Sequence, residues 1–184
     1  MARTTKFTKS EILEKTKEFI KEKGFEELNA RSLCKYIGCS TQPLFKNFES
    51  MEGLNKELRD YLHSYYDDFI NKFVKEEDYL YTISFAYALF AFKEPNIFKA
   101  LFMSKLAGSR TIDEVLHASH NVGTIKASTK QYNLSLKKAE KLYRDVRFFT
   151  HGLSCQIACN SIKVTEEEIK RLIRNIINSL RGEV

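Results

Sequence analysis

The residues of this chain best suited to metal or redox chemistry are His151, Cys155 and Cys159, which follow one another at spacings of four. On a helix this spacing puts an imidazole and two thiols on one face, where they would suit zinc or a thiol-reactive signal. Cysteines are more commonly buried as small hydrophobic residues, however. The four cysteines of the chain are also not spaced as a disulfide or zinc framework. The sequence therefore predicts no metal and no cofactor, with metal or thiol sensing as a minor alternative.

Sequence patterns of common enzyme active sites are missing. No GxGxxG, P-loop, HExxH or nucleophile-elbow pattern occurs. The first nine residues are polar and basic, unlike a signal peptide, and the longest apolar stretch, Ile83–Phe92, is too short to span a bilayer. We expect a cytoplasmic protein that is not an enzyme and has no membrane partner.

Composition favours long helices. The chain has 184 residues, of which 43% are hydrophobic, and only 7 Gly and 2 Pro interrupt it. The net charge of +6 permits binding to nucleic acid without proving it.

Apolar residues recur at helical spacing along the whole chain, and no strand pattern appears. Two capping boxes mark helix starts, Thr8 with Glu11 and Thr165 with Glu168. Further helices are expected from about Met51 into the 70s, over Tyr79–Lys93 as a buried helix, from Pro95, weakly over 111–132, and from Ser135 to about Ser161. The predicted fold class is all-α, with an N-terminal three-helix helix-turn-helix domain (1–50) followed by a helical C-terminal ligand-binding and dimerisation domain (51–184).

Residues 28–58 carry the strongest functional signal. Asn29 can cap a short helix, Gly38 can supply a turn with positive φ, and Ser40 can cap a second short helix, Thr41–Asn47. Two short helices joined around a glycine form a helix-turn-helix, whose second helix can enter the DNA major groove. This geometry would place Thr41, Gln42 and Lys46 against bases and phosphates.

The same run resembles the DNA-binding domain of the TetR family of bacterial regulators. The resemblance covers about the first third of the chain, and its positions match in register without a gap: Asn29, Leu33, Cys34, Gly38, Cys39, Ser40, Leu44, Phe45, Phe48, Ser50, Met51, Glu52 and Leu54. Two positions depart from the family pattern, because Phe45 stands where a phosphate-binding Tyr is usual and Met51 where a phosphate-binding Lys is usual. The resemblance implies a repressor that binds double-stranded, pseudo-palindromic operator DNA as a homodimer. The alternative is a helical protein–protein interaction module with the same fold and weak or no DNA binding.

The DNA-binding residues predicted on this basis are Thr41, Gln42, Pro43, Phe45, Lys46, Asn47, Asn29, Arg31 and Lys6. The resemblance further implies that the last two helices form the dimer interface and that the C-terminal domain binds a small-molecule inducer. An aromatic cluster indicates that this inducer is apolar or aromatic. The predicted ligand-binding residues are Phe85, Phe90, Phe98, Phe102, Phe149 and His151.

Overall fold

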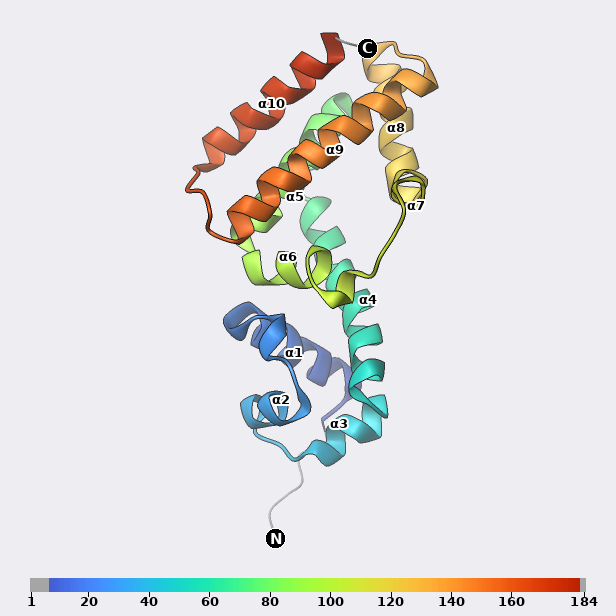
Figure 1. Cartoon of the computed structure of the whole chain (residues 1–184). Coiled ribbons are helices and arrows are strands. Elements are labelled where there is room, and N and C mark those ends of the chain that lie inside the picture. Colours follow the sequence, from blue (N-terminus) through green and yellow to red (C-terminus); the bar gives the residue numbers. More distant parts are fainter. Residues whose placement is uncertain (1–6, 183–184) are drawn as a thin grey trace. The chain divides into compact units, whose positions relative to one another are not determined.

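The computed structural model describes residues 7–182, apart from the side chains of Ser119 and His120. Within this part all regular structure is helical and no strand occurs (Figure 1). The predicted all-α fold class is confirmed. The α-helices are α1 (Lys9–Lys23), α2 (Ala30–Ile37), α3 (Thr41–Phe48), α4 (Met51–Ile70), α5 (Tyr79–Lys93), α6 (Pro95–Phe102), α7 (Ile112–Leu116), α8 (Ser119–Tyr132), α9 (Leu136–Ala158) and α10 (Glu166–Gly182). Short 3-10 helices lie between some of them: η1 (Phe25–Glu27), η2 (Glu76–Asp78) and η3 (Lys105–Ala107).

Both predicted capping boxes form. At α1 the Thr8 amide donates to the Glu11 carboxylate at 2.8 Å, and the Glu11 amide donates to the Thr8 hydroxyl at 3.2 Å. At α10 the Thr165 amide donates to the Glu168 carboxylate at 2.7 Å, and the Glu168 amide donates to the Thr165 hydroxyl at 3.2 Å. These bonds satisfy amides that no helical carbonyl can reach, so the sequence defines where both helices begin.

Two helical segments differ in extent from the prediction. Residues 111–132 form two helices, because Ala118 takes the non-helical angles φ −59° and ψ 139°. Gly123 lies inside α8 and does not interrupt it. The helix after Ser135 ends at Ala158 and not at Ser161, because Asn160 has a positive φ of 55°.

The chain divides into two compact units. Unit 1 holds the described residues up to Tyr66 together with Glu94–Gly108, and unit 2 holds Asp67–Lys93 and the described residues from Ser109 onward. Helix α6 therefore belongs to the same unit as α1, α2 and α3, and not to that of its sequence neighbour α5. The predicted boundary after residue 50 separates a DNA-binding domain from a ligand-binding and dimerisation domain. This division by function stays a prediction.

In unit 1, α1 is the central helix and contacts α2, α3 and α6. Each of these helices, together with α4, contributes buried apolar side chains: Ile12, Phe19, Ile20, Leu33, Cys34, Leu44, Phe48, Leu54, Leu58, Leu62, Ile97, Phe98 and Leu101. Burying such side chains is the main favourable contribution to folding. This core holds the inner faces of the three short N-terminal helices and leaves their outer faces to solvent.

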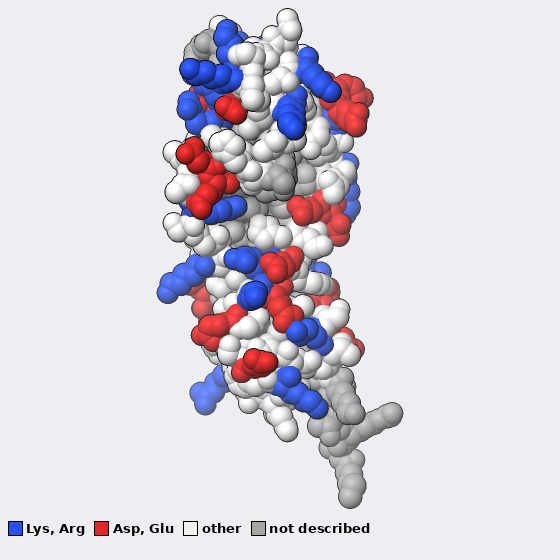
Figure 2. Space-filling model, turned by 90° about the vertical axis from the view of Figure 1, so that its right-hand side faces the viewer, with Lys and Arg blue, Asp and Glu red and all other residues white. Residues whose placement is uncertain are grey.

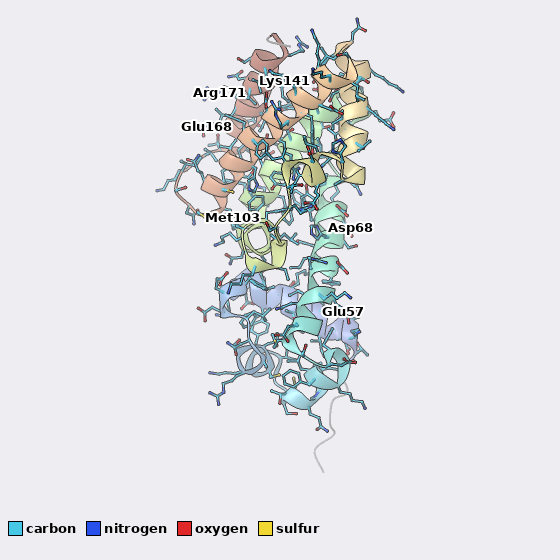
Figure 3. All side chains as sticks on the ribbon, turned by 45° about the vertical axis from the view of Figure 1, so that its right-hand side comes forward. Glu57, Asp68, Met103, Lys141, Glu168 and Arg171 are labelled. Carbon is cyan, nitrogen blue, oxygen red and sulfur yellow. The ribbon has the colours of Figure 1, made fainter. Side chains whose placement is uncertain are left out.

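In unit 2, α5 is enclosed by α8, α9 and α10, as expected for a helix that is apolar nearly all round. The apolar residues of α10 divide into two rows. Ile169, Ile173 and Ile177 are at most 1% exposed and form part of the core, whereas the row of Leu172, Ile176 and Leu180 is only half-buried. The outer faces of α9 and α10 carry charged side chains such as Lys141 and Arg171 (Figure 3). No helix in the described residues has the length and apolar character needed to cross a membrane.

Candidate functional site

The predicted helix-turn-helix is present in unit 1 as α2, a short turn and α3. Asn29 caps α2, since its side-chain oxygen accepts from the Ser32 amide at 2.9 Å and the Ser32 hydroxyl accepts from the Asn29 amide at 3.1 Å. Gly38 ends α2 in the left-handed conformation, with φ 78° and ψ 36°, which glycine adopts without the strain of a Cβ. These signals set both ends of α2 and the point at which the chain turns toward α3.

Helix α3 begins without the capping hydrogen bond that was expected from Ser40. Ser40 has the extended backbone of an N-cap residue, but its side chain makes no capping bond. An N-cap oxygen normally accepts from the second or third helical amide, and the third residue of α3 is Pro43, which has no N–H. Ser40 is exposed, and its hydroxyl makes no hydrogen bond that caps α3.

The outer face of α3 presents most of the residues predicted to read DNA. Leu44 and Phe48 lie on the inner side and are 1% and 3% exposed. The opposite side is open to solvent at four predicted positions: Thr41, Gln42, Phe45 and Lys46. A short helix with one anchored face and one free polar face is the arrangement that major-groove recognition requires.

Two of the predicted DNA-binding residues have structural roles. The Asn47 side-chain amide donates to the Pro43 carbonyl at 2.8 Å and to the Phe7 carbonyl at 3.3 Å, which joins α3 to the segment before α1. Asn29 caps α2, as described above. Pro43 itself is half-buried. These contacts hold the reading helix in place and leave Asn47 and Asn29 less free to reach a ligand.

Two cations predicted to bind DNA lie on the helix-turn-helix. Lys46 and Arg31 are exposed, and neither makes an ion pair with another described residue. On α1, by contrast, Lys17 pairs with Glu14 at 2.8 Å. Lys6, which was also predicted to contact DNA, lies outside the described residues. Lys46 and Arg31 are therefore exposed cations of the helix-turn-helix whose charge no described carboxylate neutralises.

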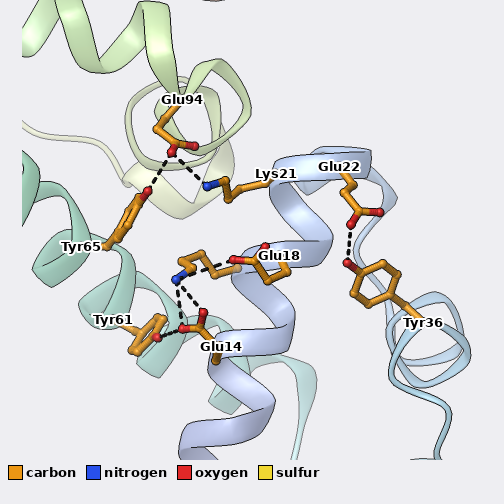
Figure 4. A network of polar contacts seen from close by, with 9 residues as sticks. Glu14, Glu18, Lys21, Glu22, Tyr36, Tyr61, Tyr65 and Glu94 are labelled. Atoms are coloured by element: carbon orange, nitrogen blue, oxygen red, sulfur yellow. Dashed lines mark hydrogen bonds and ion pairs between the residues drawn. The ribbon is translucent and has the colours of Figure 1, made fainter.

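A polar cluster joins the scaffold helices of unit 1. Glu94, the residue before α6, accepts from Lys21 Nζ of α1 at 3.0 Å and from the Tyr65 hydroxyl of α4 at 2.7 Å (Figure 4). The Asn96 side chain adds a bond to the Lys21 carbonyl at 2.9 Å. Burial and the bond to Glu94 raise the pKa of Tyr65. These bonds connect the start of α6 to both α1 and α4.

A second set of bonds in the same cluster joins α1 to α4. The Glu14 carboxylate accepts from Lys17 Nζ at 2.8 Å and from the Tyr61 hydroxyl (Figure 4). The bonds from Lys17 and Tyr61 lower the pKa of Glu14, while burial and then Glu14 raise the pKa of Tyr61 to about 12. At neutral pH Glu14 therefore stays ionised and Tyr61 stays protonated. The hydrogen bond from Tyr61 to the charged Glu14 carboxylate thus helps to hold α4 against α1.

The predicted ligand-binding residues fall into different units. Phe98 and Phe102 belong to unit 1, where their ring centroids lie 5.0 Å apart. The other four belong to unit 2: Phe85, Phe90, Phe149 and His151. Phe90 is fully buried and packs on Phe69 with centroids 5.2 Å apart, so it is a core residue. On a buried helix, an aromatic stripe alone does not show which side chains belong to the core and which could contact a ligand.

His151 is the centre of a polar group within unit 2. Its Nδ1 lies 2.9 Å from the Tyr87 hydroxyl, and its Nε2 lies 3.5 Å from Cys155 Sγ. Burial and the neighbouring Arg147 charge lower the pKa of His151, so the imidazole is neutral at pH 7. A neutral imidazole can both donate and accept hydrogen bonds to a ligand.

The polar residues around His151 form a longer row that the sequence analysis missed. Tyr143, Arg147, His151 and Cys155 recur every four residues along α9. The Tyr143 hydroxyl donates to the side-chain oxygen of Asn121 on α8 at 2.6 Å, and Arg147 donates to Tyr143 at 3.4 Å. Polar residues that recur at a spacing of four on one helix are the sequence signal that would have revealed this row.

A surface hollow of about 340 Å³ lies in unit 1. It lies between η1 and the end of α6, and Phe25, Lys99 and Met103 are among the residues that line it. None of the predicted ligand-binding residues, His151 included, lines it. In the described residues no group of three or more His, Cys, Asp or Glu side chains is arranged to hold a metal ion.

Comparison with known proteins places this geometry in a fold. No protein-family model and no curated protein matches the chain. Among solved structures the chain is similar to a TetR variant from Acinetobacter baumannii AYE, crystallised in complex with minocycline, at 15% identity and a TM-score of 0.57. The chain has the TetR fold. The match covers 97% of this chain and 96% of that chain, and it supports the predicted order of an N-terminal helix-turn-helix and a helical C-terminal region. At this identity the likeness establishes the fold alone.

Proposed function

We propose that the protein is a DNA-binding transcriptional regulator whose α3 reads the major groove. The observation that carries this proposal is the free outer face of α3 within an otherwise well-anchored helix-turn-helix. Thr41 and Gln42 would bond base edges, Lys46 would bind a phosphate, and Phe45 would lie against a sugar or a thymine methyl group. We propose that the protein acts on DNA in the cytoplasm.

The charge distribution limits how the protein would hold DNA. On the face shown in Figure 2, Lys and Arg alternate with Asp and Glu and do not form one continuous basic surface. This face would therefore offer DNA only individual phosphate contacts. Each such contact releases counterions and steepens the dependence of affinity on salt.

A change at Lys46 tests the role of α3 directly. Lys46→Ala should weaken binding to the selected operator without altering stability, and should make the salt slope shallower by about one unit. Lys137→Ala is the matched control, because it removes the same charge from an exposed position of unit 2. Operator sequences can be selected from a random duplex pool and affinities measured by fluorescence anisotropy. Failure of the unaltered protein to enrich any sequence would favour the protein–protein interaction module.

We infer that the active form is a homodimer, because a pseudo-palindromic operator needs two reading helices. Phe148 and Phe149 of α9 are 50% and 37% exposed, and Leu172 and Ile176 of α10 are half-buried. Apolar side chains of this size, left open on the two final helices, are suited to a partner surface. Phe148→Asp should give a monomer in sedimentation experiments at micromolar concentration. Ile173 is unsuitable for this test because it belongs to the core of unit 2.

A small molecule bound in unit 2 would control DNA binding by favouring a conformation with mis-spaced reading helices. The similar TetR structure contains minocycline. In this chain the polar pair of His151 and Tyr87 would orient an apolar or aromatic ligand. Compounds of this class can be screened by thermal shift and then tested for release of operator DNA. Tyr87→Phe should weaken the response, since it removes only the hydroxyl that bonds His151. An unchanged response would remove this pair from the ligand site.

A further inference from the structure

The end of α2 brings two cysteines together across the turn. The amides of Gly38 and Cys39 both donate to the carbonyl of Cys34, at 2.9 and 3.0 Å. This is the hydrogen-bond pattern of a helix that ends in a left-handed glycine, and it folds the residue after the glycine back over the last turn. In such helix ends one hydrogen bond spans six residues, and the side chains of the two residues that it joins commonly touch. Here those two positions are Cys34 and Cys39.

The fold-back brings Cys34 and Cys39 together, and the two thiols differ in accessibility. Cys34 is only 4% exposed, whereas Cys39 is half-buried in the turn. Burial, with the neighbouring Cys39, raises the pKa of Cys34 to about 11. Cys39 is therefore the sulfur that a small reagent would reach first.

The second cysteine pair of the chain provides a geometric contrast. Cys155 lies within α9 and Cys159 caps its end, four residues apart without a fold-back of the chain between them. Residues at this spacing on a helix have Cβ atoms about 5–6 Å apart, whereas a disulfide requires about 3.5–4.5 Å. Cys155 also contacts His151. A bond between Cys155 and Cys159 would require the helix end to unwind, but one between Cys34 and Cys39 would not.

We propose that Cys34 and Cys39 form a reversible disulfide by exchange with an oxidised low-molecular-weight thiol. The Cys39 thiolate attacks the small disulfide RSSR, which releases one RS⁻ and leaves a mixed disulfide on Cys39. The Cys34 thiol then loses its proton and attacks the Cys39 sulfur, which releases the second RS⁻. In total, two protein thiols and RSSR give one protein disulfide and two RSH. Disulfides are rare in a reducing compartment, and those that do form there are usually transient, as this one would be.

The bond would alter the turn that sets the start of α3. A disulfide holds its sulfur atoms at about 2.05 Å, much closer than two thiols in contact. Cys34 is packed in the core, so Cys39 and the turn must move, and Thr41 begins α3 two residues later. We expect the oxidised protein to bind operator DNA several-fold more weakly. This consequence rests on the proposed DNA-binding function, but formation of the disulfide does not.

Peptide mapping tests the disulfide independently of DNA. The full-length protein is equilibrated in mixtures of reduced and oxidised glutathione, free thiols are alkylated, and the protein is cleaved with trypsin. Cleavage after Lys35 separates Cys34 from Cys39, so their two peptides stay joined only if the disulfide exists. We expect the joined peptides to appear with oxidation and to separate on reduction, while Cys155 and Cys159 remain unlinked. Alkylation of both Cys34 and Cys39 at the most oxidising ratio would overturn the proposal.

Two variants separate the steps of the exchange. Cys34→Ala removes the second nucleophile, so the glutathione adduct should accumulate on Cys39. Cys39→Ser removes the first, so Cys34 should remain a free thiol. Absence of the adduct in Cys34→Ala would contradict the order of attack.

Anisotropy on operator DNA tests the consequence. Unaltered protein should lose affinity on oxidation and regain it on reduction, and Cys39→Ser should respond to neither. If the peptides join but affinity does not change, the effect on α3 is ruled out while the disulfide stands. If the reduced protein binds no DNA, the proposed function fails and the peptide map still decides the disulfide.

Discussion

The two turns that flank α3 achieve the same task by different means. Before α3, Gly38 takes a positive φ of 78° in a conformation that glycine adopts readily. After α3, the positive φ of 62° belongs to Glu49, and the Ser50 amide donates to the Phe48 carbonyl at 2.6 Å. This is the strained form of the γ-turn. The comparison indicates that the angle into the reading helix is set by a relaxed turn and the angle out of it by a strained one.

The strained turn is also the more crowded of the two. A Cβ added to Gly38 would meet no heavy atom within 4 Å, whereas a Cβ added to Gly53 would lie 2.1 Å from the Phe48 carbonyl oxygen. The third residue of α4 must therefore lack a side chain so that α4 can start close to the end of α3. Strain of this kind persists only where the surrounding packing imposes it. In unit 1 the buried side chains of Leu44, Phe48 and Leu54 impose it.

Gly53→Ala should have the largest effect on this comparison. Helix propensity alone predicts a gain of about 0.5–1 kcal/mol for this change. The clash with a backbone atom opposes it, and we expect a net loss of about 3 kcal/mol in the free energy of unfolding. Urea denaturation measures the change, and a stabilised variant would show that the exit from α3 is not crowded.

Gly38→Ala should cost less, because its Cβ would have space and only the conformation resists it. A non-glycine residue in the left-handed region costs about 1–2 kcal/mol. Gly38→Asn is the matched control, since asparagine tolerates this region better than alanine. We expect the urea midpoints to rank glycine highest, then asparagine, then alanine. Equal midpoints for the last two would mean that some contact, and not the conformation, selects glycine at this position.

These turns also show what the sequence could and could not predict. Gly38 and the Asn29 cap were predictable, because each depends on residues next to it in sequence. The positive φ of Glu49 was not, since it follows from how α3 and α4 pack together. The missing Ser40 cap could have been foreseen from Pro43 three residues later, but that proline was predicted only as a DNA-binding residue.

The predicted sites differ in the same way. On α3 one amphipathic short helix was enough to identify the exposed residues Thr41, Gln42 and Lys46. On α5 the aromatic residues surround the whole helix, so the sequence could not tell which of them face the core. The assignment of Phe98 to one unit and Phe90 to the other depends on tertiary packing that helical periodicity does not contain.

Glu49→Gly should stabilise the protein, in contrast to both glycine replacements. A strained non-glycine backbone costs about 1–3 kcal/mol, and the greater freedom of glycine in the unfolded chain offsets about 0.5–1 kcal/mol of the relief. A net gain of about 1 kcal/mol is expected. Glu49→Ala is the control, because it removes the same charge but keeps the Cβ, and it should show no such gain. A loss of stability in Glu49→Gly would mean that the turn is relaxed and that the two turns do not differ in strain.

The smallest effect on stability is expected for the replacement of Ser40, the residue before α3, when it is compared with that of Asn29, the residue before α2. Asn29→Ala removes the side-chain oxygen that accepts from the Ser32 amide at the start of α2 and should cost about 1 kcal/mol. Ser40→Ala should leave the urea midpoint unchanged, because the Ser40 side chain makes no capping bond and the residue is exposed. Any loss of operator affinity in Ser40→Ala would then come from the interface and not from the fold. Such a loss would place the amino-terminal end of α3 at a phosphate, where helix amides favour negative charge. A lower urea midpoint in Ser40→Ala would instead show that serine does cap α3 in solution, and would remove this difference between the two helices of the helix-turn-helix.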